Sequence, residues 1–195
     1  MIRIVGPLDT SEYEAALALR KLITQAWPNI IEDPIHNILI IAGAKCHGQL
    51  TRDIDLLVLG SFGTGLKYSP FLSFKTPDGQ LHTPDAIEVR SLCAVIEIKG
   101  HHSGDVRFVG TTAKVRYKGK WHNASEQNEK QVFAVKNYLE YHHIQPPWIT
   151  PLLWLRNVSN TALPPRPHSI IGSQVTWELL LNVIGQITPP ILMPR

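Results

Sequence analysis

The stretch Cys93–Gly100, CAVIEIKG, decides the fold, because it combines the pattern of a buried strand with two charged residues. Side chains two residues apart in a β-strand point to the same face, about 7 Å from one another, so Glu97 and Lys99 would project together. The apolar residues around them would anchor the strand in a core. Because an unpaired buried charge is costly, this Glu-x-Lys pair points to a functional site.

Composition places the chain among ordinary globular domains. Its 195 residues are 44% hydrophobic and 18% charged, which predicts one folded domain, with a core at about 10–187, and excludes a disordered chain. A net charge of +3 is compatible with a nucleic-acid partner. Cys46 and Cys93 are too few for a disulfide framework and are predicted to be small core residues. With no apolar run of eighteen residues and no signal-peptide pattern, we expect a cytoplasmic protein that does not contact membranes.

Hydrophobic periodicity and turn residues predict helices and strands in alternation. A helix should run from Thr10 or Ser11 to about Gln25, and a second one from Asn123 or Ser125 to about Tyr141. The remaining predicted segments are strands at 36–42, 52–59, 93–99 and 148–156, a turn at 43–51, a hairpin excursion at 60–91, a basic hairpin-like stretch at 100–121, a third helix at 174–187 and a linker or tail at 188–195. This order predicts an α/β domain with a mixed central sheet flanked by helices.

Carboxylates on neighbouring strands indicate a metal site. Alternation along the strand 52–59 would place Asp53 and Asp55 on one face, and Asp55 beside Glu97 would form an acidic pair next to Lys99. Two carboxylates and a backbone carbonyl, here that of Ile98, suit a hard ion such as Mg²⁺ or Mn²⁺, which polarises a phosphodiester and activates a water. Lys99 could orient that water and neutralise developing charge. Ordinary ion pairs on an exposed strand face are the alternative.

The wider arrangement resembles the nuclease-related domain (NERD) family of the PD-(D/E)XK nuclease superfamily. The resemblance covers roughly Ser11 to Tyr141. It rests on SEYEAALALRKL in the first helix, G-Q-x-x-R-D-I-D-L-L-V-L, V-I-E-I-K-G, a G-D-V turn with a later Trp, and N-A-S-E-Q opening the second long helix. The excursion 60–91 is longer than the family's short connection, and Ala124 stands where the family often has proline.

This resemblance implies a restriction-endonuclease-like core and roles for five side chains. Asp55 and Glu97 would hold Mg²⁺ or Mn²⁺, Lys99 would serve the nucleophilic water, Glu14 would be the helix carboxylate, and Gln127 would line the pocket. Gln131, one turn later, is a second candidate for the position of Gln127. Glu14 also stands at capping-box spacing from Ser11, which would explain it without any catalytic role.

The segment that follows the central strand could bind nucleic acid. Its basic residues could contact phosphates while Tyr117 or Trp121 stacks on a base. A solvated hairpin with its aromatic residues on the packed side is the alternative. The candidate binding residues are Arg107, Lys114, Arg116, Lys118, Lys120 and Trp121.

The sequence therefore predicts a metal-dependent nuclease, with DNA favoured over RNA, that acts as a module in DNA processing or defence. It could be fused to or act with another such module, and a homodimer is compatible with the sequence. Two alternatives stay open. Gly43-Ala44 with Asp53-Ile54-Asp55 is similar to the metal-binding signature of polymerase-β-like nucleotidyltransferases, although Ala44 replaces the serine of that signature. The chain could also be an inactive nucleic-acid-binding domain.

Overall fold

The structure is a computed structural model that describes residues 1–31, 34–51, 53–68, 74–75, 81–82, 87–164, 169–176 and 180. Its largest sheet, within that part of the chain, has six strands in the order β1-β2-β3-β6-β10-β11. These strands are β1 (Ile2–Val5), β2 (His36–Lys45), β3 (Asp53–Tyr68), β6 (Ile87–His102), β10 (Thr150–Asn157) and β11 (Ile170–Ile171). The sheet is mixed: β2, β3 and β6 are antiparallel, whereas β1 runs parallel to β2 and β10 runs parallel to β6.

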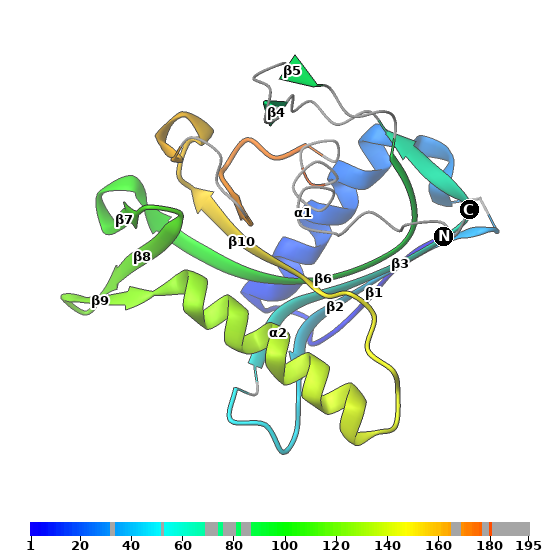
Figure 1. Cartoon of the computed structure of the whole chain (residues 1–195), viewed down its shortest axis with the longest axis horizontal. Helices are drawn as coiled ribbons and strands as arrows, with labels where there is room; N and C mark the ends of the chain where they lie inside the picture. The colour runs from blue at the N-terminus through cyan, green and yellow to red at the C-terminus, as the bar shows by residue number, and fades with distance from the viewer. Residues whose placement is uncertain are drawn as a thin grey trace.

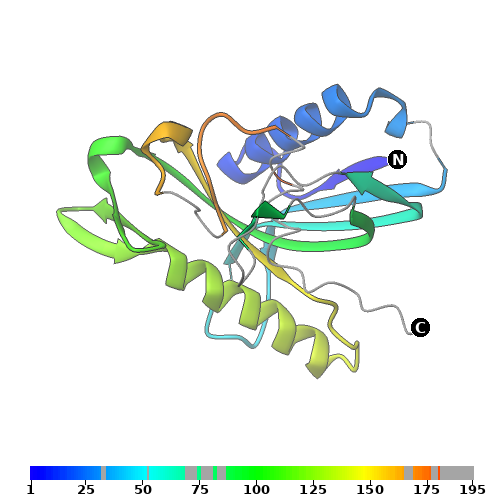
Figure 2. The same cartoon turned by 45° about the horizontal axis from the view of Figure 1, so that its top comes forward.

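Two long helices cover opposite faces of this sheet, which gives three layers (Figures 1 and 2). Helix α1 (Ser11–Ala26) buries Ala15, Leu19 and Ile23, and helix α2 (Ala124–Tyr141) buries Ala134 and Val135. The predicted α/β architecture with a mixed central sheet is confirmed. No helix among the described residues is long and apolar enough to span a membrane.

Strand β6 is the centre of the molecule. It pairs with β3 on one side and with β10 on the other, and its residues alternate between the two helical layers. Ile96 belongs to the α1-side cluster, which also contains Leu19, Ile40 and Leu56. Val95 belongs to the α2-side cluster, which also contains Cys46, Cys93, Ile54 and Val135. Both cysteines are free and buried, as predicted.

A smaller sheet follows β6 directly. It consists of β7 (Val106–Val109), β8 (Thr112–Tyr117) and β9 (Lys120–Asn123), joined to β6 through the short helix η2 (Ser103–Asp105). Figure 1 shows this sheet at the left end of the molecule, where β9 leads into α2. The segment predicted to be hairpin-like is therefore a three-stranded antiparallel sheet.

Several predicted boundaries change in the structure. The predicted strands 52–59 and 93–99 are parts of two long strands, because Leu66–Tyr68 of β3 pair with Ile87–Val89 of β6 inside the predicted excursion. The short strands β4 (Phe74–Lys75) and β5 (Leu81–His82) form a separate hairpin within it. The predicted turn at 43–51 starts later, because β2 extends to Lys45.

The ends of the chain also differ from the expectation. Strand β1 begins at Ile2, ahead of the predicted core. The predicted third helix at 174–187 lies mostly outside the described residues. Gln174–Thr176 are not helical, whereas Leu180 is helical and its backbone N–H donates a hydrogen bond of 3.1 Å to the Thr176 carbonyl. The tail 188–195 also lies outside the described residues. The remaining short elements are the 3₁₀ helices η1 (Pro28–Ile31) and η3 (Asn160–Ala162).

Candidate active site

The sheet opens at the point where β3 and β6 stop pairing. Their register ends at the pair Leu56–Ile96. Immediately beyond it, the Ile98 backbone N–H donates a hydrogen bond of 2.7 Å to the Asp55 carboxylate oxygen Oδ2. The Asp55 side chain thus takes the place of a backbone partner where the strands separate. This contact brings Asp55 to the part of β6 that carries Glu97 and Lys99.

Gly43 on β2 lies opposite this part of β3. The pairs Ala42–Leu56 and Ala44–Ile54 flank Gly43 on β2 and Asp55 on β3. Gly43 has a φ of +61°, a left-handed conformation that glycine adopts without steric cost. Strict alternation would put Leu56 and Ile54 on one face, yet Leu56 packs in the α1-side cluster and Ile54 in the α2-side cluster. The alternation is therefore broken at Asp55.

This break corrects the prediction that Asp53 and Asp55 share a face. The Asp53 side chain is exposed. Its backbone carbonyl, however, accepts a hydrogen bond of 3.1 Å from Nε2 of Gln131 on α2. Gly43-Ala44 lies inside a paired strand rather than in a loop. The geometry therefore gives no support to the nucleotidyltransferase alternative, which needs the Asp53 and Asp55 carboxylates together.

Glu97 is almost completely buried, with 1% of its side chain exposed, and it points toward α2. One carboxylate oxygen, Oε1, forms an ion pair with Lys99 Nζ, and the other, Oε2, accepts a hydrogen bond from Gln131 Nε2. A carboxylate can be buried at this depth because both of its oxygens have partners. The prediction that Glu97 and Lys99 project together is confirmed.

Lys99 connects this buried pair to the surface. Its side chain is 16% exposed, and its Nζ lies 3.3 Å from Oε1 of the exposed Gln127. Gln127 and Gln131, offered by the sequence as alternatives, therefore both reach the site, Gln127 at its solvent edge and Gln131 at its base. The adjacent Asn128 fixes α2 to the central strand, because its Nδ2 donates to the Val95 carbonyl at 3.1 Å.

The first helix contributes a different carboxylate from the predicted one. The N-cap of α1 is Thr10, whose hydroxyl accepts a hydrogen bond of 3.2 Å from the backbone N–H of Tyr13. The predicted capping box of Ser11 and Glu14 is therefore wrong. Glu14 is exposed, whereas Glu12 is partly buried and its charge acts on Asp55.

The pKa of the Asp55 carboxyl is strongly raised. Burial and then the negative charge of Glu97 raise the pKa of Asp55 to about 7, with a smaller contribution from Glu12. The Ile98 N–H and the positive charge of Lys99 act in the opposite direction. The pKa rises because a charged carboxylate is desolvated here next to a like charge. A site of this kind favours either a proton or a cation between the two carboxylates.

The donors suit a hard divalent ion. Asp55 and Glu97 offer carboxylate oxygens, and burial, followed by the charge of Glu97, raises the pKa of Asp55. A cation bound beside Asp55 would favour its ionised form. The described residues contain no group of three or more His, Cys, Asp or Glu side chains able to hold a metal ion. Two protein carboxylates are nevertheless enough for Mg²⁺, which usually keeps several waters in its coordination shell. The predicted third donor, the Ile98 carbonyl, belongs to the residue whose N–H binds Asp55.

The predicted nucleic-acid-binding residues lie on the smaller sheet, apart from these carboxylates in the sequence but linked to them through α2. Arg107 is on β7, Lys114 and Arg116 are on β8, and Lys120 and Trp121 are on β9. Lys118 lies in the turn between β8 and β9. Asn123, the last residue of β9, is the N-cap of α2 and accepts a hydrogen bond of 3.1 Å from the Glu126 backbone N–H.

The chain matches no protein-family model, no curated protein and no solved structure.

Proposed function

We propose that this protein is a metal-dependent nuclease that hydrolyses phosphodiester bonds in nucleic acid. One observation supports the proposal: Asp55 is bound to the Ile98 N–H on the adjacent strand and is affected by the charge of Glu97. Lys99 contacts both Glu97 and Gln127. The fold agrees with it, because α1, three antiparallel strands, α2 and a parallel strand follow in the order expected of a restriction-endonuclease-like core.

Each side chain has a role in this proposal. Asp55 and Glu97 would hold Mg²⁺ or Mn²⁺, with the Ile98 carbonyl as a further oxygen donor. The bound ion would polarise the phosphodiester and lower the pKa of a water molecule. Lys99 would orient that water and neutralise charge developing on the phosphate. Gln131 would hold the Glu97 carboxylate in place from below, and Gln127 would keep the Lys99 ammonium at the solvent edge.

The reaction is a hydrolysis. The oxygen of the oriented water forms a bond to phosphorus as a P–O ester bond breaks, and the leaving alkoxide takes up a proton. The products are one strand with a phosphomonoester end and one with a hydroxyl end. DNA is the favoured substrate. A role as a module in DNA processing or defence, acting with a fused or separate partner module, follows from the family resemblance alone.

The test is a cleavage assay on labelled duplex DNA, single-stranded DNA and RNA with Mg²⁺, with Mn²⁺ or with EDTA. We expect cleavage that requires the metal and is lost at least 100-fold in Lys99→Ala. Asp53→Asn is the matched control, because it removes an exposed carboxylate two residues from Asp55, and it should leave cleavage unchanged. Circular dichroism of each variant separates lost chemistry from lost folding.

Three results would count against this function. Nucleotide transfer from a triphosphate that is lost in Asp53→Asn would establish the nucleotidyltransferase instead. Tight binding of nucleic acid without turnover in either metal would establish the binding domain. Cleavage that persists in folded Lys99→Ala would remove Lys99 from the chemistry.

A further inference from the structure

We propose that one face of the sheet β7–β8–β9 docks the sugar-phosphate backbone of a nucleic-acid duplex, using arginines held on Trp121, and that Trp121 does not stack on a base. This inference rests on the proposed nuclease function for the kind of substrate. It differs from the prediction made from the sequence, in which Tyr117 or Trp121 stacks on a base. The proposal concerns how the substrate is held and not how it is cleaved.

The register of the sheet places four of the predicted binding residues on a single face. Arg107 is opposite Lys114, and Arg116 is opposite Trp121. Directly opposed residues of antiparallel strands share a face, and so do residues two apart on β8. Arg107, Lys114, Arg116 and Trp121 therefore form one surface, which we call the arginine face.

The opposite face of the sheet is packed. Val106, Phe108, Ala113 and Val115 alternate with the residues of the arginine face, and they pack in a cluster with Leu153 and Leu155 of β10. Lys99 is the register partner of Leu155 and Glu97 that of Leu153. The sheet is thus anchored beside the strand segment that carries the candidate active site, while its arginine face is turned away from the core.

Cations cover the aromatic rings on this sheet. The Arg107 guanidinium carbon lies 4.2 Å from the centroid of the Trp121 ring, and that of Arg116 lies 5.9 Å from it. The Lys118 ammonium lies 5.3 Å from the centroid of the exposed Tyr117 ring. Single-strand-binding proteins stack bases on the faces of aromatic rings. Here Arg107 lies over the Trp121 ring, and its guanidinium can still donate to phosphates.

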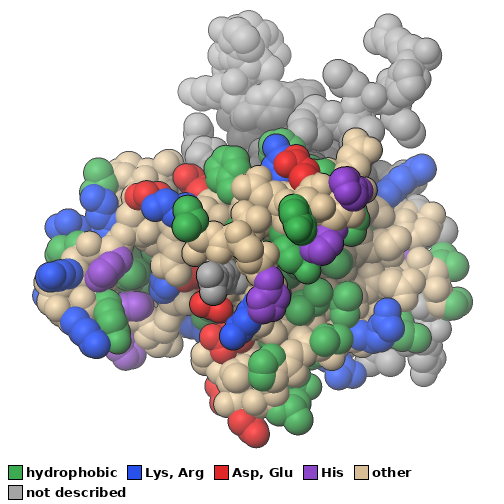
Figure 3. All heavy atoms as spheres, turned by 90° about the horizontal axis from the view of Figure 1, so that it is seen from below, with side chains coloured by type: hydrophobic (Ala, Val, Ile, Leu, Met, Phe, Trp, Pro, Cys, Tyr) green, Lys and Arg blue, Asp and Glu red, His purple; other side chains and the backbone are tan. Residues whose placement is uncertain are grey.

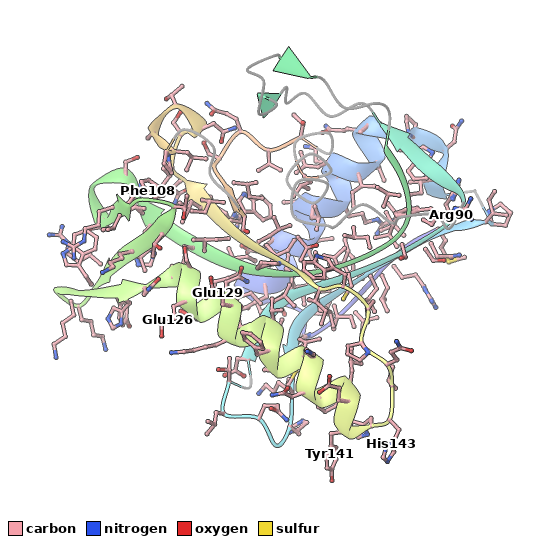
Figure 4. The ribbon with its side chains drawn as sticks, viewed as in Figure 1. Arg90, Phe108, Glu126, Glu129, Tyr141 and His143 are labelled. Atoms are coloured by element: carbon pink, nitrogen blue, oxygen red, sulfur yellow. The ribbon has the colours of Figure 1, made fainter. Side chains whose placement is uncertain are left out.

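The charge of the segment complements a polyanion. Residues 106–123 contain five Lys or Arg and no Asp or Glu. Lys and Arg side chains gather at the left end of Figure 3, which is the end that the smaller sheet occupies in Figure 1. Among the acidic neighbours, Asp105 forms an ion pair with Arg116 at 2.7 Å, and Glu126 on the first turn of α2 (Figure 4) pairs with Lys130.

The test measures binding without cleavage. Fluorescence anisotropy of a labelled duplex and of its single strand, in EDTA over a range of salt concentrations, gives Kd and its salt dependence. Each phosphate contact adds about 0.9 to the slope of log Kd against log salt. We expect Arg107→Gln, Lys114→Gln and Arg116→Gln each to lower this slope by about that amount. Lys136→Gln, which removes an exposed lysine farther along α2, is the control and should leave the slope unchanged.

Variants of Trp121 separate the two uses of its ring. We expect Trp121→Ala to weaken duplex binding several-fold, because the arginines lose the surface that orders them, and Trp121→Phe to retain most of the affinity. A single strand that binds more tightly than the duplex, and that alone loses affinity in Trp121→Ala, would overturn the proposal in favour of base stacking. Unchanged salt slopes in all three cation variants would also overturn it.

Failure of this inference can be told apart from failure of the proposed function. If the salt slopes fall as expected but no metal cleaves the bound duplex, the docking surface stands and the nuclease function does not. If Lys99→Ala abolishes cleavage while the three cation variants leave KM and the salt slope unchanged, the nuclease stands and this docking surface does not.

Discussion

At the scale of single residues, the two carboxylates of the candidate site differ in their hydrogen-bond partners. Glu97 is buried with a partner on each oxygen, Lys99 on one side and Gln131 on the other. Among the described residues, Asp55 has a single backbone donor, Ile98, and its pKa is raised to about 7, first by burial and then by Glu97. The ionised form of Asp55 is therefore disfavoured in the absence of a cation.

The raised pKa of Asp55 predicts that stability falls as pH rises through the neutral range. The folded protein keeps a proton on Asp55 up to a pKa of about 7, whereas the unfolded chain releases it near pH 3.9. Between these values the folded state binds more protons, so the free energy of unfolding falls as pH rises. In EDTA, the free energy of unfolding of the unsubstituted protein should be about 2–3 kcal/mol lower at pH 8 than at pH 5, and Asp55→Asn should remove this difference. Urea unfolding at both pH values measures it, and an equal fall in the variant would contradict it.

Substitutions of the two glutamines of α2 should have different effects, one on stability and the other on cleavage. Gln131 is buried and serves both Glu97 and the Asp53 carbonyl, so Gln131→Ala should cost about 2–3 kcal/mol by leaving a buried charged group without its partner. Gln127 is exposed, and its side chain accepts a hydrogen bond from Lys99. Gln127→Ala should therefore change stability by less than about 0.5 kcal/mol while lowering cleavage. Urea unfolding of the two variants, with the cleavage assay, checks this. Equal losses of stability would show that Gln131 is not a support of the site.

At the scale of elements, Gly43 on β2 lies opposite Asp55, at the point where the side chains of β3 change face. Its left-handed conformation coincides with the change of face between Leu56 and Ile54. An added Cβ would meet only Pro7, at ordinary contact distance, so the cost of Gly43→Ala comes from the backbone conformation.

We expect Gly43→Ala to destabilise the protein by about 1–2 kcal/mol and to lower cleavage, because β2 would regain its alternation and displace Asp55. Gly104→Ala is the matched control, since Gly104 has open space around its would-be Cβ and no left-handed φ. It should change stability by less than about 0.5 kcal/mol. Thermal unfolding and the cleavage assay measure these effects. Equal effects of the two substitutions would contradict the prediction that the left-handed conformation of Gly43 supports the site.

The sequence was sufficient where a feature depends on short-range periodicity. The alternation in Cys93–Gly100 correctly placed Glu97 and Lys99 on one face, and the patterns of α1 and α2 located both helices. The sequence was insufficient where one residue shifts the start of a helix or the side-chain alternation of a strand. The sequence allowed a helix cap at either Thr10 or Ser11. The observed cap is Thr10, so the Ser11–Glu14 capping box does not form, and Glu12 rather than Glu14 is the helix carboxylate whose charge acts on Asp55. The left-handed Gly43 broke an alternation that otherwise joins Asp53 to Asp55.

Features that depend on contacts between distant parts of the chain are only weakly indicated by the sequence. Strand β1 has only four residues and lies at the edge of the sheet, too short a run for periodicity to distinguish from a loop. The extension of β3 and β6 past Leu59 depends on cross-strand pairing, which a single sequence does not reveal. The covering of Trp121 by Arg107 likewise follows from the register between β7, β8 and β9.

At the scale of the whole molecule, β6 joins every layer. It pairs with β3 and β10, packs Ile96 toward α1 and Val95 toward α2, and leads through η2 into the smaller sheet. The site residues Glu97 and Lys99 are therefore part of the strand on which the stability of both layers depends. This position places the backbone of both residues rigidly, as the proposed catalytic role would require.

This position predicts that damage to the core spreads through the whole protein. Ile96 is 2% exposed and lies directly before Glu97, so Ile96→Ala should cost about 2–5 kcal/mol through lost burial and an unfilled cavity. Leu50 is fully exposed, and Leu50→Ala should change the free energy of unfolding by less than about 0.5 kcal/mol. Urea unfolding followed by circular dichroism should show one transition in both variants, shifted only in the first. Two separate transitions in Ile96→Ala would mean that the layers on either side of β6 unfold independently, and that the site is supported by one layer alone.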